Sequence, residues 1–151
     1  MSLVLPLRRL ASEPRPEPAA RPVARTLDLD GTPLLEAWAA RVRDAAEAML
    51  LIDRSGRLVA LSGRCAELLG LDVARAAGAL LLDLVRVVDF TAAGVPVPDP
   101  EVQLPPLRAA DTGRLNRGLI RLRTGAVARS YDVVGIPLSD GAGALGFVAP
   151  V

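Results

Sequence analysis

The sequence has no histidine and only one cysteine, Cys65, among its 151 residues. The missing histidine excludes haem held by histidine, zinc sites that use histidine, Ser-His-Asp triads and Cys-His dyads. A single cysteine excludes an internal disulfide and a metal site built from several cysteines. The sequence therefore lacks the side chains on which the commonest hydrolytic and zinc-dependent enzymes depend.

Aromatic residues, lysine and long apolar runs are also scarce. One Trp, one Tyr and two Phe are too few for a surface that stacks nucleic-acid bases, and the net charge of +1 favours neither an anionic nor a cationic partner. The longest apolar run, residues 76–82, is far shorter than the ~20 residues of a membrane span. We therefore predict a cytoplasmic protein with no direct contact to membrane or nucleic acid. All 18 basic residues are arginine, which, with many alanines, leucines and glycines, indicates a high-GC bacterial source.

The clearest local pattern lies at residues 49–70. Two short apolar runs, Met49–Ile52 and Leu58–Leu61, flank a segment in which Gly56 can take a positive φ, which predicts two strands joined by a tight turn. Ser62 then stands where it can cap a short helix that ends at Gly70. The segment thus predicts a strand, a turn, a second strand and a small helix.

Helices and a loop are predicted for the middle of the chain. Residues 78–90 have apolar side chains at helical spacing and predict a helix. Four prolines make residues 91–105 a loop, and a short helix over residues 106–110 is expected to end near Gly113.

Three more strands are predicted for the last part of the chain. Alternating apolar residues and the Asp140-Gly141 turn place them at residues 118–123, 127–138 and 145–148. With the first hairpin, they make a five-stranded antiparallel sheet.

Two stretches resemble the PAS family of sensor domains. One is the strand, turn, strand and helix of residues 49–70, although Ser62 stands where the family commonly has asparagine. The other is residues 133–151, in which Pro137-Leu138, the Asp-Gly turn and a glycine before the last apolar strand fit the family pattern. The resemblance covers about residues 37–149. It implies an α+β, PAS-like domain over residues 49–151, with a five-stranded antiparallel sheet and short helices on one face.

The resemblance also implies signal sensing or partner recognition, in transcriptional or two-component regulation. A pocket between the helices and the sheet would be mostly apolar and would take a small apolar ligand. Its candidate lining residues are Cys65, Leu69, Leu81, Leu84, Val85, Val133 and Ile136. In this interpretation the ligand shifts the packing of the helix at residues 78–90 against the sheet. The alternative is a ligand-free adaptor subunit that docks a partner protein through the N-terminal part of the chain.

The N-terminal part consists of two predicted segments. Residues 1–31 contain five prolines and predict an extended or disordered arm, or alternatively a docking arm that orders on a partner. Residues 32–48 follow as an amphipathic helix that begins at Thr32-Pro33. Its apolar face either covers the domain's own sheet or, as is common in PAS proteins, packs against its copy in a dimer. The candidate partner-facing residues are Leu34, Leu35, Trp38 and Val42.

Three other features each have a structural and a functional interpretation. Arg117, Arg121 and Arg123 share one face of a predicted strand and form either a solvated face or a surface for an anion or an acidic partner. Cys65 is either a small core residue or a ligand-contacting, redox-sensing thiol. Residues 141–146 match G-x-G-x-x-G, but too little chain follows for the helix that a dinucleotide site requires, so we interpret them as a hairpin turn.

No catalytic arrangement emerges from the sequence. Asp83 and Asp89 lie six residues apart on the predicted helix and face different sides, while Tyr131 and Asp132 are neighbours on a strand and point to opposite faces. No nucleophile is paired with a base. We therefore predict a non-catalytic domain without metal or cofactor, which works as a homodimer or with another protein chain.

Overall fold

The computed structural model describes residues 32–151, and the arm predicted for residues 1–31 lies outside the described residues. The helices and strands follow in the order α1 (Thr32–Arg43), β1 (Met49–Asp53), β2 (Leu58–Leu61), α2 (Gly63–Leu69), α3 (Val73–Ala76), α4 (Leu81–Leu84), β3 (Arg86–Val88), α5 (Pro100–Gln103), α6 (Pro105–Thr112), β4 (Asn116–Thr124), β5 (Val127–Pro137), the 3-10 turn η1 (Ser139–Gly141) and β6 (Gly143–Pro150).

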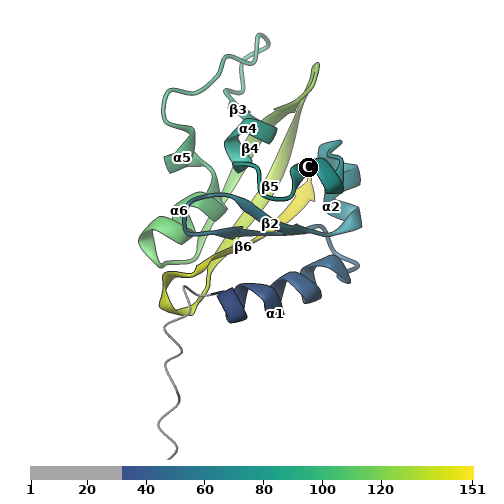
Figure 1. Ribbon diagram of the computed structural model, residues 1–151. Helices are drawn as coiled ribbons and strands as arrows, with labels where there is room; N and C mark the ends of the chain where they lie inside the picture. The colour runs from purple at the N-terminus through teal and green to yellow at the C-terminus, as the bar shows by residue number, and fades with distance from the viewer. Residues whose placement is uncertain (1–31) are drawn as a thin grey trace, which may run out of the picture.

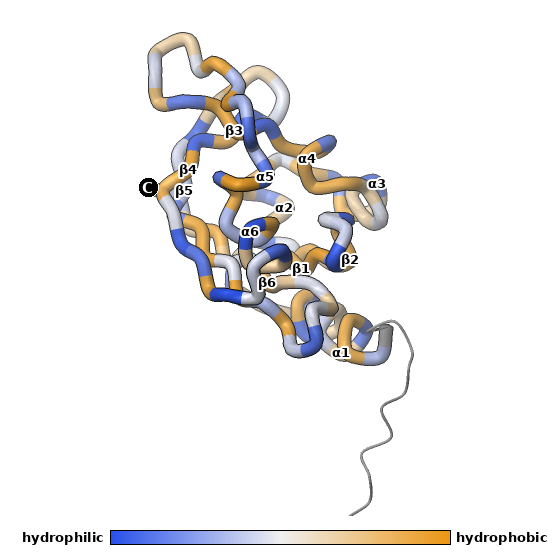
Figure 2. The backbone as a smooth tube through the Cα atoms, turned by 90° about the vertical axis from the view of Figure 1, so that its left-hand side faces the viewer, coloured by the Kyte–Doolittle hydropathy of each residue, from blue (hydrophilic) through white to orange (hydrophobic). Residues whose placement is uncertain are grey.

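One antiparallel sheet organises these elements, with the strand order β2-β1-β6-β5-β4-β3 (Figure 1). The first and last strands in the sequence, β1 and β6, are thus neighbours near the middle of the sheet. The helices α2, α4 and α6 pack on one face, which we call the inner face, and α1 lies below the sheet on the outer face (Figures 1 and 2). Each face has its own cluster of buried apolar side chains, so the sheet separates two cores.

The opening hairpin confirms the prediction from the sequence. Gly56 has a φ of 82° in the turn between β1 and β2, a conformation that glycine adopts without steric cost. The side chain of Ser62 accepts a hydrogen bond from the backbone N–H of Cys65 and caps α2, and Gly70 ends the helix with a φ of 63°. The short helix before Gly113 is confirmed as α6.

The helix predicted for residues 78–90 is wrong. Only the single turn α4 is helical, and the chain then becomes extended as β3, where Val87 pairs with Leu122 of β4. Because an apolar residue every third or fourth position also fits a turn followed by a short strand, the periodicity could not separate the two, and the β-branched Val85, Val87 and Val88 favour the strand. The added strand makes the sheet six-stranded, where five strands had been predicted.

Two predicted boundaries also shift. The amphipathic helix ends at Arg43 rather than at residue 48, because the chain must turn before Met49 enters β1 beside β6. The loop predicted for residues 91–105 contains the short helix α5, and none of the α5 residues is buried.

Each edge strand of the sheet is partly covered by the chain itself. Leu58 of β2 exchanges backbone hydrogen bonds with residues 78–79, and Val87 of β3 accepts one from Val97. Pro96 lies within this second segment, and Pro98 and Pro100 follow it, so the segment has fewer N–H donors for a partner strand. A partner strand is therefore not expected to extend the sheet. Within residues 32–151, no helix has the length and hydropathy needed to span a membrane.

Candidate functional site

The contact between α6 and the inner face of the sheet decides whether the domain has an internal pocket. Gly135 of β5 and Gly146 of β6 lie directly opposite each other, and the Pro105-Pro106 step of α6 rests on them. A β-carbon at Gly146 would lie 2.8 Å from Cγ of Pro106, and one at Gly135 would overlap the backbone of Pro105. The glycines thus let the first turn of α6 lie in backbone contact with the sheet.

This close packing leaves almost no internal space. The apolar gap enclosed between the inner helices and the sheet has a volume of about 10 Å³, which holds at most one water molecule. Its walls are the apolar side chains of Leu50, Leu69, Leu81, Val85, Leu104, Pro106, Leu122, Val133 and Val148. A drug-sized ligand needs several hundred Å³, so the interior in this conformation is a packed core.

The structure brings together most of the residues that were predicted to line a pocket. Leu69, Leu81, Val85 and Val133 surround the small internal gap. Cys65 is fully buried in the same cluster, and Leu84 packs at its margin. Ile136 does not join them, because it lies on the outer face of β5 against the α1 cluster. Tyr131, Val133 and Gly135 alternate on the inner face of β5, so the next residue, Ile136, points to the outer face. This alternation is visible in the sequence and could have predicted its position.

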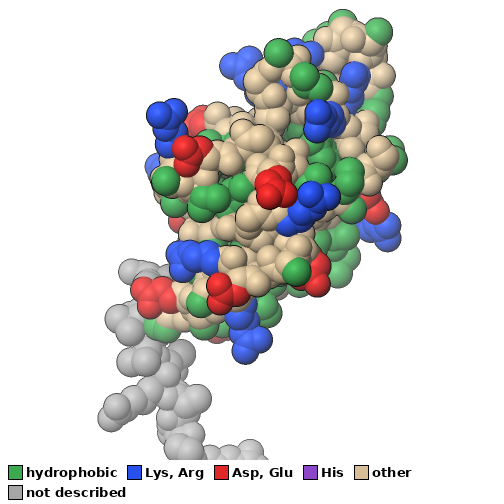
Figure 3. Space-filling view, turned by 90° about the vertical axis from the view of Figure 1, so that its right-hand side faces the viewer, with side chains coloured by type: hydrophobic (Ala, Val, Ile, Leu, Met, Phe, Trp, Pro, Cys, Tyr) green, Lys and Arg blue, Asp and Glu red, His purple; other side chains and the backbone are tan. Residues whose placement is uncertain are grey.

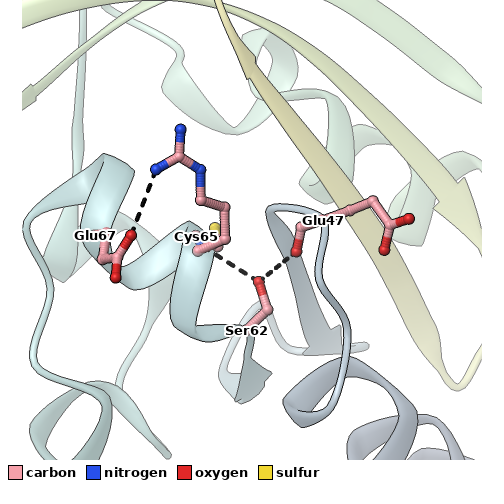
Figure 4. Close-up of polar contacts among 5 residues, drawn as sticks. Glu47, Ser62, Cys65 and Glu67 are labelled. Carbon is pink, nitrogen blue, oxygen red and sulfur yellow. Dashed lines mark hydrogen bonds and ion pairs between the residues drawn. The ribbon is translucent and has the colours of Figure 1, made fainter.

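A buried hydroxyl ties the helical layer to the strands. Oγ of Ser62 donates to the carbonyl of Glu47 at 2.7 Å and accepts from the backbone N–H of Cys65 at 3.2 Å (Figure 4). It also accepts from the backbone N–H of Met49 at 3.0 Å. The same packing buries Cys65, and this burial raises the pKa of its thiol to about 12. A protonated, inaccessible thiol packs as an apolar residue and is a poor nucleophile.

The outer face of the sheet is partly covered by α1. Val42 and Ala39 of this helix are buried against β1 and β2, and Leu34, Leu35 and Trp38 are half-buried in the same cluster. The residues that were predicted to face a partner therefore lie on the domain's own sheet. Of the two alternatives left by the apolar stripe, this is the one in which the helix covers the domain's own sheet.

Beside α1, part of the outer face has no covering element among the described residues. We call it the open sheet face, and it consists of Leu119, Val134, Phe147 and Ala149, with the ion pair Arg117–Asp132 among them. Leu119 is 55% exposed, and Val134 and Phe147 are half-buried. The Arg117 guanidinium donates two hydrogen bonds to Asp132, which lowers the pKa of that carboxyl group. The open sheet face therefore combines apolar side chains with a neutralised ion pair.

The other two arginines of the predicted anion surface bind the chain itself. Arg121 donates to the backbone carbonyls of Asp89 and Thr91, and Arg123 donates to that of Ala93. They hold the loop that follows β3 against the outer side of β4. Acidic and basic side chains are mixed over most of the face in Figure 3, so no large field of one sign is present there. These contacts favour a structural role for the three arginines.

Sequence reasoning missed a groove on the surface beside α6. It has a volume of about 390 Å³ and lies between the β1–β2 turn, α4, α5 and α6, which are grouped on one side of the molecule (Figure 2). Its floor is apolar, with Leu80, Leu82 and Leu107, while Arg54, Glu101, Arg108 and Asp111 stand along it. The side chains come from four separate segments, so no local pattern in the sequence could predict the groove. No group of three or more potential metal ligands occurs within residues 32–151.

Comparison with known proteins finds solved structures of similar architecture. No protein-family model and no curated protein matches the sequence. Among solved structures, the PAS domain of a protein from Colwellia psychrerythraea is similar, with a TM-score of 0.55, 18% identity, and coverage of 78% of this chain and 97% of that one. The LOV protein of Rhodobacter sphaeroides has a TM-score of 0.59 and 16% identity over 80% of this chain and 68% of its own. The PAS domain of nitrogen regulation protein NR(II) from Vibrio parahaemolyticus has a TM-score of 0.52 and 13% identity, covering 75% of this chain and 96% of that one.

The chain has the PAS fold. The α+β, PAS-like architecture implied by the resemblance is thus confirmed, with a sixth strand added at the edge. In this PAS fold, α6 fills the region between the helices and the sheet, and part of the outer face of the sheet is left open among the described residues.

Proposed function

We propose that this chain is a non-catalytic signalling module that holds a partner protein, and that its interior binds no small molecule. The partner is a second copy of the chain or another cytoplasmic protein in bacterial transcriptional or two-component regulation. The proposal rests on the contact of Pro105-Pro106 with Gly135 and Gly146, because this contact reduces the internal cavity to a volume of about 10 Å³.

Nothing in the closed interior suits a polar or metal-dependent ligand. Its walls are apolar. The inner cluster contains two ionisable side chains, Tyr131 and Cys65, and the thiol of Cys65 is protonated. Tyr131 is already engaged, since its hydroxyl donates to the carbonyl of Leu68 at 2.9 Å. An apolar ligand would first have to lift α6 from the sheet.

The open sheet face is the surface that supports partner binding. Val134 of β5 lies directly opposite Phe147 of β6, which packs in the apolar cluster under α1, and Leu119 of β4 lies diagonally across from Val134. Since the edge strands are short and partly covered, a partner is expected to contact the face rather than extend the sheet. A regulatory setting is supported by the similarity to the PAS domain of a protein that is named for nitrogen regulation.

Native mass spectrometry of the purified full chain tests the first half of the proposal. We expect the native mass to be a whole multiple of the denatured polypeptide mass. An excess that disappears on denaturation would show a retained small molecule and would contradict the closed interior.

A pair of surface variants tests the second half. Leu119 and Val127 are exposed to nearly the same extent, 55% and 54%, but only Leu119 lies on the open sheet face, while Val127 begins β5 at the β4–β5 turn. We expect Leu119→Asp to abolish the stable complex seen in native mass spectra or in quantitative pull-downs, and Val127→Asp to leave it intact. Equal behaviour of the two variants would exclude the open sheet face as the binding surface.

A further inference from the structure

The groove beside α6 has charged groups that have no ionic partner among the described residues. Glu101 of α5 and Asp111 of α6 stand on it together with Arg54 and Arg108. The ion pairs within residues 32–151 are Arg64–Glu67 and Arg117–Asp132, so none of these four groups is paired there. An apolar floor with unpaired charges of both signs suits a short amphipathic segment.

The wall formed by α5 is suited to such a segment. This helix has no buried residue, and its Val102 is 54% exposed while lining the groove. A bound segment would cover Val102 and add apolar contacts to a helix that otherwise has few.

The first residues of this chain have the complementary chemistry. Residues 3–10 contain five apolar residues and the pair Arg8-Arg9, and Glu13 follows shortly afterwards. Two arginines match Glu101 and Asp111, and the acidic residue matches Arg54 or Arg108. The open sheet face is a poorer match, because its one carboxylate, Asp132, is already paired with Arg117, and Arg121 and Arg123 lie beside it on β4.

The arm is long enough to reach the groove. Residues 11–31 span up to about 70 Å when extended, whereas a domain of this size has a radius of gyration of about 14 Å. Since the arm is long enough to reach every face of the domain, its length does not identify the binding site. The match of charges and apolar groups favours the groove.

We infer that residues 3–13 of the chain bind in the groove between the β1–β2 turn, α4, α5 and α6 of the same molecule. The arm then acts as an intramolecular occupant of this groove. The inference does not depend on the open sheet face, so it stands or fails separately from the proposed function.

A nitroxide label at the start of the arm tests this directly in the full chain. Cys65 is the one cysteine and is 0% exposed, so the label attaches to the new thiol of Ser2→Cys. In ¹⁵N-labelled protein, we expect the amide signals of Gly56, Val102 and Ala110 to lose intensity, and ascorbate reduction of the nitroxide to restore them. Uniform broadening, or the strongest broadening on the open sheet face, would overturn the inference.

Charge reversals then test the ion pairs. The double variant Glu101→Arg and Asp111→Arg is expected to abolish the selective broadening, while the control Asp44→Arg, exposed in the turn after α1, retains it. The arm variant Arg8→Glu with Arg9→Glu should have the same effect without altering the folded domain, and combining both pairs should restore the broadening. If the combination does not restore it, the ion pairs do not form.

A mixing experiment separates the chain's own arm from that of a second copy. Spin-labelled ¹⁴N chains are added to unlabelled ¹⁵N chains, so that only intermolecular contact broadens the signals. We expect no selective broadening of the groove amides, and its appearance would overturn the intramolecular assignment.

Discussion

Gly135 lies directly opposite Gly146 across β5 and β6, and neither can carry a side chain while α6 keeps its position. Because both residues are glycines, two side chains are missing from the core at this point, and Pro105 and Pro106 fill the space. Rigid prolines in contact with sheet backbone lose little conformational entropy on folding and leave few voids. The interior is therefore closed by the choice of residues at four positions.

Replacing Gly135 with alanine should destabilise the domain. The new β-carbon overlaps the backbone of Pro105, which cannot move without lifting α6, so we expect a loss of about 3 kcal/mol in the free energy of unfolding. Gly118→Ala is the matched control, because its β-carbon would meet Cγ of Pro105 at an ordinary 3.7 Å. Urea unfolding followed by circular dichroism measures both. Equal stability of the two variants would mean that α6 is not held against the sheet.

Removing the Ser62 hydroxyl should also destabilise the domain. Ser62→Ala loses the cap of α2 and leaves the carbonyl of Glu47 without its partner (Figure 4). It also leaves the backbone N–H of Met49 without a partner. We expect a cost of about 2 kcal/mol. The control is Ser55→Ala, in which an exposed hydroxyl that donates to Asp53 is lost. A difference of less than about 0.5 kcal/mol between the two variants would contradict a structural role for the buried hydroxyl.

The local parts of the fold could be predicted because their signals are local. The positive φ of Gly56, the cap at Ser62 and the αL end at Gly70 all follow from single residues in a short segment. The β-branched valines were the one local signal for the strand β3, since its three residues become a strand only by pairing with residues 121–123 of β4, more than 30 positions later in the chain. Tertiary pairing overrides helical spacing in such short apolar runs.

The candidate site divides in the same way. The alternation of β5 placed Val133 inward, but the closure of the pocket depends on four residues of α6, β5 and β6 that meet only in the fold. A glycine in a strand signals close approach of another backbone, and Gly135 and Gly146 carried this signal in the sequence. What approaches them could not be read from the sequence, nor could the groove that four segments enclose.

The loop after β3 should respond to acid through Asp89. Its carboxylate accepts hydrogen bonds from the Thr91 hydroxyl and from the backbone N–H groups of Thr91 and Val95, and the nearby Arg121 adds attraction. These contacts lower the pKa of Asp89, so the stabilisation that they give is present above about pH 4 and is lost as the pH falls through the lowered pKa. An NMR titration of the Thr91 and Val95 amides should show a midpoint below the usual aspartate range, and Asp89→Asn should remove it. A midpoint at the usual value would contradict these contacts.

The thiol of Cys65 should be unreactive in the folded protein. It is 0% exposed and its pKa is about 12, so roughly one thiol in ten thousand is ionised at pH 8 even before access is considered. A thiol-reactive dye at pH 8 should label the native chain only as fast as the chain opens, and urea should accelerate labelling in parallel with unfolding. Ser62→Ala should also accelerate it, because the loss of its three hydrogen bonds destabilises the start of α2, where Cys65 lies. Ser55→Ala should not. Rapid labelling of the native protein would place Cys65 within reach of solvent and would favour the ligand-contacting or redox-sensing role over the core role that its burial supports.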